Sequence, residues 1–195
     1  MMNTAERTSE THPIEVGWLS DLWPGRVGLT LAPGKQQPGG LSGAWMRSLE
    51  LDLQRLRTVY GAQHLVCLLE DRELVKLAIG ELPQRAAANG LEFHRLPIQD
   101  GSLPAEVGAV RELVVRICSW AAAGQTTVIH CMGGLGRAGT IGGCVLRAAG
   151  LDAPATFAAL LAARGVNCPE TNEQRLYVQQ FSVGQGVCRK SYTGR

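Results

Sequence analysis

Hydrophobic positions along the chain follow two patterns, short apolar runs and longer segments in which apolar residues recur every three or four positions. The short runs predict strands, which occupy residues 14–19, 26–31, 64–69, 91–96 and 126–129. The longer segments predict helices, which occupy residues 42–60, 74–78, 84–89, 106–123, 137–148, 154–164 and 169–181. Strands that alternate with helices are typical of an α/β fold, with a mostly parallel central sheet of about five strands and helices on both faces.

Three segments fall outside these patterns. Residues 1–12 are polar and predicted to be disordered, and residues 185–195 form an irregular tail, which leaves one domain over residues 13–184. Residues 33–40 are rich in proline and glycine, which excludes regular structure and predicts a loop. Lys35 in this loop either contacts a bound anion or is a solvated charge.

Composition narrows the class of protein. The net charge of +2 and the pI of about 8.3 are too mild to indicate a nucleic-acid partner. No apolar run reaches the length of a membrane span, and the N-terminus lacks the apolar core of a signal peptide. Six scattered cysteines without a Cys-x-x-Cys pair favour buried thiols in a reducing compartment. We therefore expect a cytoplasmic monomer that binds neither nucleic acid nor membranes.

The sequence predicts no cofactor and no metal. His64 and Cys67 are the nearest approach to a metal pair, but a spacing of three on a strand puts them on opposite faces. His94 is expected to be a partly exposed strand residue.

Residues 127–140 combine a buried strand, a glycine-rich loop and the start of a helix. Such a loop aims several backbone N–H groups at one point, which together with the helix dipole makes an anion site. Cys131 begins the loop and Arg137 ends it. The field of this site favours the thiolate form of a cysteine, and an arginine fork can hold two oxygens of a bound anion. A tight strand-to-helix turn with a buried structural cysteine is the alternative.

In this stretch the chain resembles the cysteine-dependent protein tyrosine phosphatase superfamily. It is most similar to the dual-specificity branch that contains the kinase-associated phosphatases, whose His-Cys-x-Gly-Gly-x-Gly-Arg loop matches residues 130–137. Residues 27–35 and 96–101 match as well, and the resemblance covers residues 14–182. The sequence departs from the superfamily at Ala138, where Ser or Thr is usual.

The resemblance implies phosphate-ester hydrolysis through a cysteinyl-phosphate intermediate. Cys131 would be the nucleophile, and Arg137 would bind the phosphoryl group. The remaining phosphate-binding positions are Met132, Gly133, Gly134, Leu135 and Gly136. His130 points away from the pocket on strand alternation, so we expect it to orient the loop by hydrogen bonds, as a satisfied core histidine also would.

The proton for the leaving oxygen should come from a carboxylic acid on a neighbouring loop. Asp100 follows a strand and matches the acid in the family's Pro-x-x-Asp-Gly loop, although by itself it could also be a turn former. Asp71 and Glu106 are the alternatives. By resemblance alone, Gln174 would position the water of the second step.

The expected substrate is a phosphorylated protein or peptide. The loop positions Met132, Gly133 and Leu135 are uncharged, which disfavours a polyphosphorylated inositol ring. Phosphoserine, phosphothreonine and phosphotyrosine all stay open. A phosphoprotein-binding module without activity and a rhodanese-type sulfurtransferase are the competing interpretations, and the arginine spacing favours a phosphatase over the latter.

Overall fold

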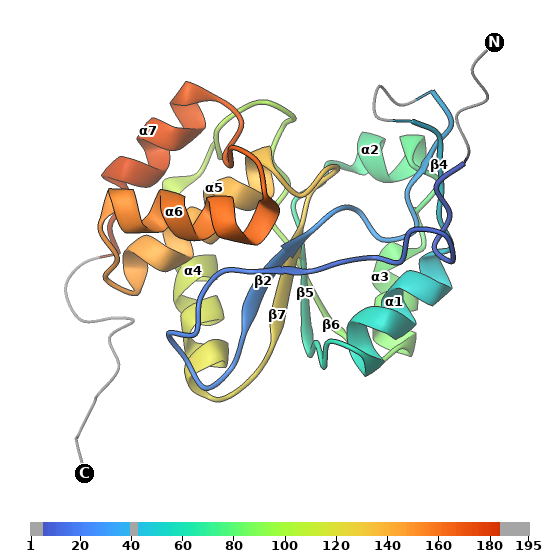
Figure 1. Ribbon diagram of the computed structural model, residues 1–195, viewed down its shortest axis with the longest axis horizontal. Helices are drawn as coiled ribbons and strands as arrows, with labels where there is room; N and C mark the ends of the chain where they lie inside the picture. The colour runs from blue at the N-terminus through green and yellow to red at the C-terminus, as the bar shows by residue number, and fades with distance from the viewer. Residues whose placement is uncertain (1–5, 40–42, 184–195) are drawn as a thin grey trace.

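The computed structural model describes residues 6–39 and 43–183, so the predicted tail over 185–195 lies outside the described residues. At its centre is a five-stranded sheet in the order β1-β2-β7-β5-β6 (Figure 1). Its strands are β1 (Gly17–Trp18), β2 (Val27–Thr30), β5 (His64–Cys67), β6 (Glu92–Arg95) and β7 (Thr127–His130). Only the β1–β2 pair is antiparallel, and the other neighbours in this sheet run parallel. The predicted mostly parallel sheet is confirmed.

Seven α-helices among the described residues flank the sheet on both faces, as predicted. They are α1 (Leu49–Thr58), α2 (Asp71–Lys76), α3 (Leu82–Ala88), α4 (Val107–Ala122), α5 (Gly136–Ala148), α6 (Ala153–Arg164) and α7 (Asn172–Gln180). Successive side chains of β7 point to opposite faces of the sheet. Ile129 packs in the core beneath α4 to α7, and Val128 packs in the core beneath α1 to α3. None of the helices in the described part of the chain is long and apolar enough to cross a bilayer.

Helix α5 packs unusually close to its neighbours. A Cβ atom at Gly142 would lie 3.0 Å from Leu29 Cδ2 of β2, and one at Gly143 would lie 2.7 Å from Val178 Cγ1 of α7. The two glycines therefore let α5 approach the sheet and α7 together, and this packing holds its first turn at the end of β7.

The structure corrects two predictions near the N-terminus. The helix predicted over 42–60 begins only at Leu49, because Ser48 caps it by accepting a hydrogen bond from the N–H of Leu51 (3.3 Å). Trp45 lies instead in strand β4 (Trp45–Met46). This strand pairs antiparallel with β3 (Gln36–Gln37), inside the loop predicted to have no regular structure.

Arg7 extends this small sheet. Its N–H donates to the carbonyl of Ala44 (2.9 Å), and its carbonyl accepts from the N–H of Met46 (3.1 Å). Residues 6–12, which the polar composition assigned to a disordered segment, are thus part of the fold. Residues 1–5 lie outside the described residues.

The last helix also begins later than predicted, at Asn172 rather than Pro169. Thr171 and Gln174 form a reciprocal capping box. Thr171 Oγ1 accepts from the N–H of Gln174 (3.2 Å), and Gln174 Oε1 accepts from the N–H of Thr171 (3.3 Å). The cap fixes the start of α7 and buries Gln174.

Candidate active site

Cys131 and Arg137 lie where β7 ends and α5 begins. The carboxyl ends of parallel strands meet at this edge of the sheet, which is where α/β proteins bind their ligands. Cys131 directly follows β7, residues 131–135 form the loop, and Arg137 occupies the first turn of α5. Both side chains are buried, with residue exposures of 3% and 2%.

Gly134 gives the loop its shape. Its φ of 76° lies in the left-handed region, and a Cβ atom there would stand 2.4 Å from the carbonyl oxygen of Thr30. In this conformation the N–H of Gly134 donates to Cys131 Sγ (3.3 Å). The loop therefore folds back so that a backbone donor faces the sulfur.

Arg137 is held by four contacts from two segments, helix α2 and the loop after β6. Its Nη1 and Nη2 donate to the two carboxylate oxygens of Glu73 (2.6 and 2.8 Å), and Nη1 also donates to the carbonyl of Ile98 (2.9 Å). Nη2 lies 2.9 Å from Asp100 Oδ1. Burial would lower the pKa of Arg137, but the Glu73 hydrogen bonds and the negative charges around it raise the pKa overall. Its buried Nε–H has no acceptor among the described residues, so this donor is unused in the structure.

Glu73 is the site residue that the sequence did not predict. It stands in the first turn of α2, and its Oε2 accepts from the N–H of Glu70 (2.9 Å). Burial would raise the pKa of Glu73, yet the hydrogen bonds from Arg137 and from the Glu70 N–H outweigh it and lower the pKa. One signal in the sequence could have pointed to Glu73. The Glu70-x-x-Glu73 spacing is that of a capping box, and it begins a helix soon after β5, the strand next to β7.

Among the three acidic candidates, the structure brings Asp100 to Arg137. Asp100 lies in the loop after β6, and its side chain is 67% exposed. Asp71 is instead paired with Arg95 on the surface (2.6 Å). Glu106 is the exposed N-cap residue of α4 and makes no side-chain capping bond.

Gln174 lies beside the loop but is already engaged. A Cβ atom at Gly136 would lie 3.2 Å from Gln174 Oε1, so the amide and the loop are neighbours. Its Nε2 donates to the carbonyl of Ser102 in the Asp100 loop (3.3 Å). Gln174 thus ties α7 to the loop that carries Asp100.

His130 and Thr140 make contacts within the strand-loop-helix unit. Burial lowers the pKa of His130 to about 4, so its imidazole is neutral near pH 7, and Nδ1 donates to the carbonyl of Cys131 (3.3 Å). The hydroxyl of Thr140 donates to the carbonyl of Gly136 (2.9 Å). It is therefore not available to replace the hydroxyl that is missing at Ala138, which is fully buried.

Lys35 is not a solvated charge, because the residue is only 6% exposed. The pKa of Lys35 is lowered overall. Burial and the positive charge of Arg47 lower it, and the negative charge of Cys131 opposes them. Asp52 holds the backbone of Gly34, the residue before Lys35, in place. The Asp52 carboxylate accepts from the N–H of Gly34 (2.9 Å) and is held by two 2.8 Å contacts from Arg47. Lys35 is thus a second buried basic residue near the loop, and its pKa responds to the charge of Cys131.

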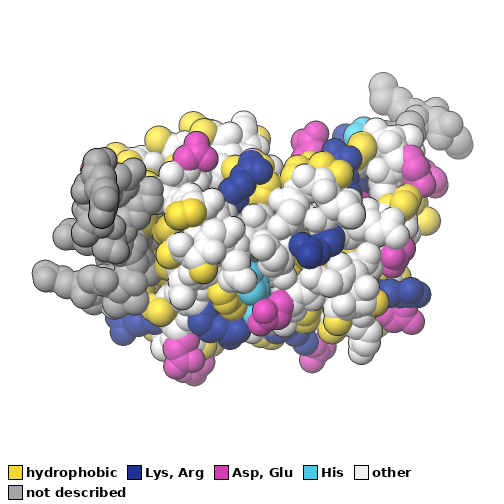
Figure 2. Space-filling model, turned by 90° about the horizontal axis from the view of Figure 1, so that it is seen from below, with side chains coloured by type: hydrophobic (Ala, Val, Ile, Leu, Met, Phe, Trp, Pro, Cys, Tyr) yellow, Lys and Arg dark blue, Asp and Glu magenta, His cyan; other side chains and the backbone are white. Residues whose placement is uncertain are grey.

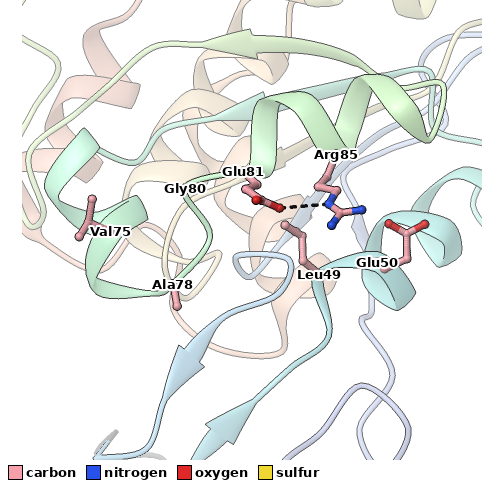
Figure 3. Close-up of a pocket in the computed structure, with 7 residues that line it drawn as sticks. All are labelled: Leu49, Glu50, Val75, Ala78, Gly80, Glu81 and Arg85. Carbon is pink, nitrogen blue, oxygen red and sulfur yellow. Dashed lines mark hydrogen bonds and ion pairs between the residues drawn. The ribbon is translucent and has the colours of Figure 1, made fainter.

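A cleft of about 520 Å³ between α1, α2 and α3 is separate from this site (Figure 3). It is lined by Leu49, Glu50, Val75, Ala78, Gly80, Glu81 and Arg85. Glu81 and Arg85 form an ion pair on its wall (3.2 Å). None of the residues predicted for catalysis or phosphate binding lines this cleft.

Comparison with known proteins places the chain in a phosphatase family. Residues 37–179 match the family described as "PTP-SAK: Swiss Army Knife protein, DSP-PTPase phosphatase domain". The chain therefore belongs to this family of dual-specificity-type phosphatase domains, as the resemblance of the loop predicted.

Individual relatives make the placement more specific. Cyclin-dependent kinase inhibitor 3 of Mus musculus is 27% identical over 175 residues, which cover 88% of this chain and 80% of the relative. The crystal structure of kinase-associated phosphatase, with its catalytic site cysteine substituted by serine, has a TM-score of 0.77 at 25% identity and covers 86% of this chain and 93% of that one. Tk-PTP in its active form has a TM-score of 0.63 at 25% identity, with coverage of 85% and 94%.

Proposed function

We propose that the chain is a phosphoprotein phosphatase that hydrolyses phosphotyrosine, phosphoserine or phosphothreonine through a cysteinyl-phosphate intermediate. The main support for the proposal is the set of contacts that the Arg137 guanidinium makes. Glu73 fixes both terminal nitrogens of a buried guanidinium, and the remaining Nε–H has no acceptor among the described residues. A buried donor beside a glycine-rich loop and a cysteine suits a tetrahedral oxyanion.

In the first step, oxygens of the phosphoryl group accept hydrogen bonds from the amides of residues 132–137 and from Arg137 Nε. Cys131 Sγ attacks phosphorus opposite the leaving oxygen, so a P–S bond forms as the P–O ester bond breaks. Asp100 gives its proton to the departing oxygen. Its contact with Arg137 Nη2 supports this role, because the same arginine holds the phosphoryl group.

In the second step, water attacks the phosphocysteine and Asp100 takes up its proton. Sulfur leaves as a thiolate, toward which the N–H of Gly134 is directed. Gln174 is proposed to position the water. To do so its amide must exchange the contact with Ser102 for one with the water, since both ends of the amide are bonded in this structure.

The substrate is proposed to be a phosphorylated protein. The curated relatives are named as cyclin-dependent kinase inhibitor 3, and a solved neighbour is a kinase-associated phosphatase. The loop itself carries no extra cation, but Lys35 is a buried basic residue whose pKa is lowered by burial and raised by the charge of Cys131. A monomeric state and a cytoplasmic location stay predictions of the sequence.

Turnover of an aryl phosphate by the purified chain, in the presence of EDTA, tests the proposal. We expect hydrolysis without added metal, and Cys131→Ser should abolish it while still binding a phosphopeptide. Loss of activity in EDTA, or retained activity in the serine variant, would refute the mechanism. Binding without turnover in the unmodified chain would favour a phosphoprotein-binding module, and sulfur transfer from thiosulfate would favour a sulfurtransferase.

A further inference from the structure

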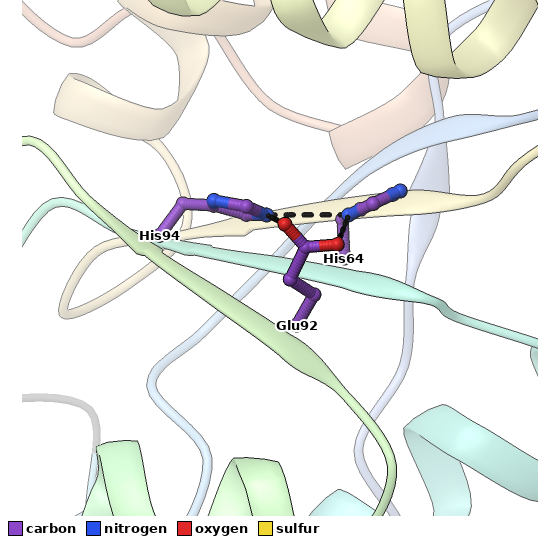
Figure 4. A group of neighbouring side chains, drawn as sticks. All are labelled: His64, Glu92 and His94. Atoms are coloured by element: carbon purple, nitrogen blue, oxygen red, sulfur yellow. Dashed lines mark hydrogen bonds and ion pairs between the residues drawn. The ribbon is translucent and has the colours of Figure 1, made fainter.

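Two histidines and a glutamate meet at the amino ends of β5 and β6, at the opposite end of the sheet from Cys131. His64 and Glu92 are register partners on these parallel strands, and His94 follows Glu92 by two residues on the same face. Figure 4 shows their side chains turned toward one another. Figure 2 views this end of the molecule, and a histidine beside an acidic side chain reaches the surface there.

The spacing of the three side chains matches a metal coordination sphere. His64 Nδ1 and His94 Nε2 are 3.2 Å apart; Glu92 Oε2 lies 3.4 Å from His64 Nδ1, and Glu92 Oε1 lies 3.5 Å from His94 Nε2. Zinc binds imidazole nitrogen and carboxylate oxygen at about 2.0–2.2 Å in a tetrahedron, which puts neighbouring ligand atoms roughly 3.3–3.5 Å apart. One ligand atom from each of the three residues lies within 4.8 Å of the other two, so the three side chains can surround one ion after a small movement.

The surroundings hold both imidazoles in place. The side chains of His64 and His94 are only 3% and 7% exposed, and Trp120 of α4 packs on both rings, with centroids 3.9 and 4.4 Å away. His94 is thus more buried than the sequence predicted. Gln125 Oε1 lies 3.2 Å from His64 Nε2 and can only accept, so this nitrogen carries the proton and the lone pair of Nδ1 faces the cluster.

One contact opposes a metal ion. Arg116 Nη2 lies 3.1 Å from His94 Nδ1 and can only donate, so His94 carries its proton on Nε2 and donates it to His64. A metal on Nε2 requires the proton on Nδ1 and the departure of Arg116. Arg116 is exposed and lines a cleft of 360 Å³ together with Glu112, which lies one turn earlier on α4. After leaving His94, the Arg116 guanidinium can therefore pair with the Glu112 carboxylate.

We propose that His64, Glu92 and His94 bind one Zn²⁺ ion, with water in the fourth position, and that Arg116 competes with the ion for His94. Two imidazoles and one carboxylate favour zinc and its neighbours over Mg²⁺ or Ca²⁺, which prefer oxygen ligands. The ion would link β5 to β6 and stabilise the folded chain, since the site forms only when the strands pair. Because it lies at the far end of the sheet, we expect turnover to be independent of it.

Titration of the full chain with Co²⁺, a spectroscopic stand-in for Zn²⁺, tests the site. A Cys131→Ser background removes the catalytic thiol as a competing ligand. We expect visible d–d absorption that saturates at one ion per chain, without the intense near-ultraviolet band of thiolate ligation, and a rise of the melting temperature with Zn²⁺. No visible band, or a thiolate band, would overturn the proposal.

Three substitutions in the same background, one of them a control, sharpen the test. Glu92→Gln should weaken binding by about 10-fold or more, and its 62% exposed side chain makes a folding defect unexpected. Glu81→Gln, an exposed control on the other side of the sheet, should bind like the parent chain. Arg116→Gln should tighten binding several-fold, because it removes the competing donor. Equal affinities of the Glu92→Gln and Glu81→Gln chains, or no gain on replacing Arg116, would overturn the assigned ligands.

Discussion

At the scale of single residues, the site depends on how Arg137 is held. Glu73 occupies two of its nitrogens, while the loop of Asp100 supplies a third contact and a backbone carbonyl. The guanidinium is therefore oriented before any ligand arrives, which reduces the cost of organising the site on binding.

Glu73→Gln should misorient this guanidinium. We expect kcat/KM to fall by about 10²-fold, because a small displacement of a positioning group has effects of this size. Removing one charge of a buried pair should also destabilise the fold by up to about 3–5 kcal/mol. Glu70→Gln, on a partly exposed neighbour in the same helix cap, is the control. A destabilised Glu73→Gln chain with normal kcat would assign Glu73 a purely structural role.

Asp100→Asn should remove the proton donor. General acid catalysis contributes about 10²–10⁴-fold, so we expect a loss of this order on alkyl phosphates and a much smaller one on nitrophenyl phosphate, whose leaving group departs unaided. Steady-state rates on both substrates provide the measurement, with Asp71→Asn as the control. Equal losses on the two substrates would mean that Asp100 is not the acid.

At the scale of elements, the β7–loop–α5 unit determines where the sulfur and the amides point. Gly134 and Gly133 are adjacent but differ in their surroundings. Gly134 has a left-handed φ and backbone atoms of Thr30 and Leu31 within 3 Å of a built Cβ, whereas Gly133 has no atom within 4 Å.

Gly134→Ala should therefore destabilise the chain by about 1–3 kcal/mol, the cost of a strained backbone position, with a clash against Thr30 in addition. Gly133→Ala should be close to neutral. Unfolding in denaturant compares the two variants directly. Similar stabilities would show that the loop adopts a different path from the one described.

This element was predictable because its signals are local. The apolar run before Cys131, the clustered glycines and the periodic positions after Arg137 each specify their own part of the structure. Strands β3 and β4 have no such signal. Gln36–Gln37 and Trp45–Met46 pair in the folded chain, where Arg7 bridges to Trp45 and the buried Arg47–Asp52 ion pair lies next in sequence. Glu73 was missed as a site residue for the same reason, because only the tertiary fold brings it to the loop. For Lys35 the sequence left an anion contact and a solvated charge both open, since burial is a property of the folded chain.

At the scale of the whole molecule, strand order decides which loops share the site. β7 lies between β2 and β5, so the loop after β2 brings Lys35 and the helix after β5 brings Glu73 to the same edge. Alternation of strands and helices predicted the parallel sheet but not this order, which depends on contacts between distant segments.

Acid should destabilise the molecule through its buried histidines. Burial lowers the pKa of His130 and of His94 to about 4, below the usual value of about 6.5. The unfolded chain binds these protons first, so stability is fully present above about pH 6.5 and is lost as the pH falls toward 4. Denaturant unfolding at a series of pH values, in EDTA, should show this decline. A constant free energy of unfolding between pH 6.5 and 5 would contradict the burial of the neutral rings.

Covalent chemistry at Cys131 can be tested by a rapid acid quench during turnover, followed by mass spectrometry of the peptide containing Cys131. Since Ala138 offers no hydroxyl to the departing thiolate and Thr140 is bonded to Gly136, breakdown of the intermediate should be about 10–100-fold slower than with serine at position 138. We expect a burst of product with phosphate on Cys131, and a faster steady state in Ala138→Ser. Turnover with no phosphate on Cys131 at any quench time would contradict this expectation.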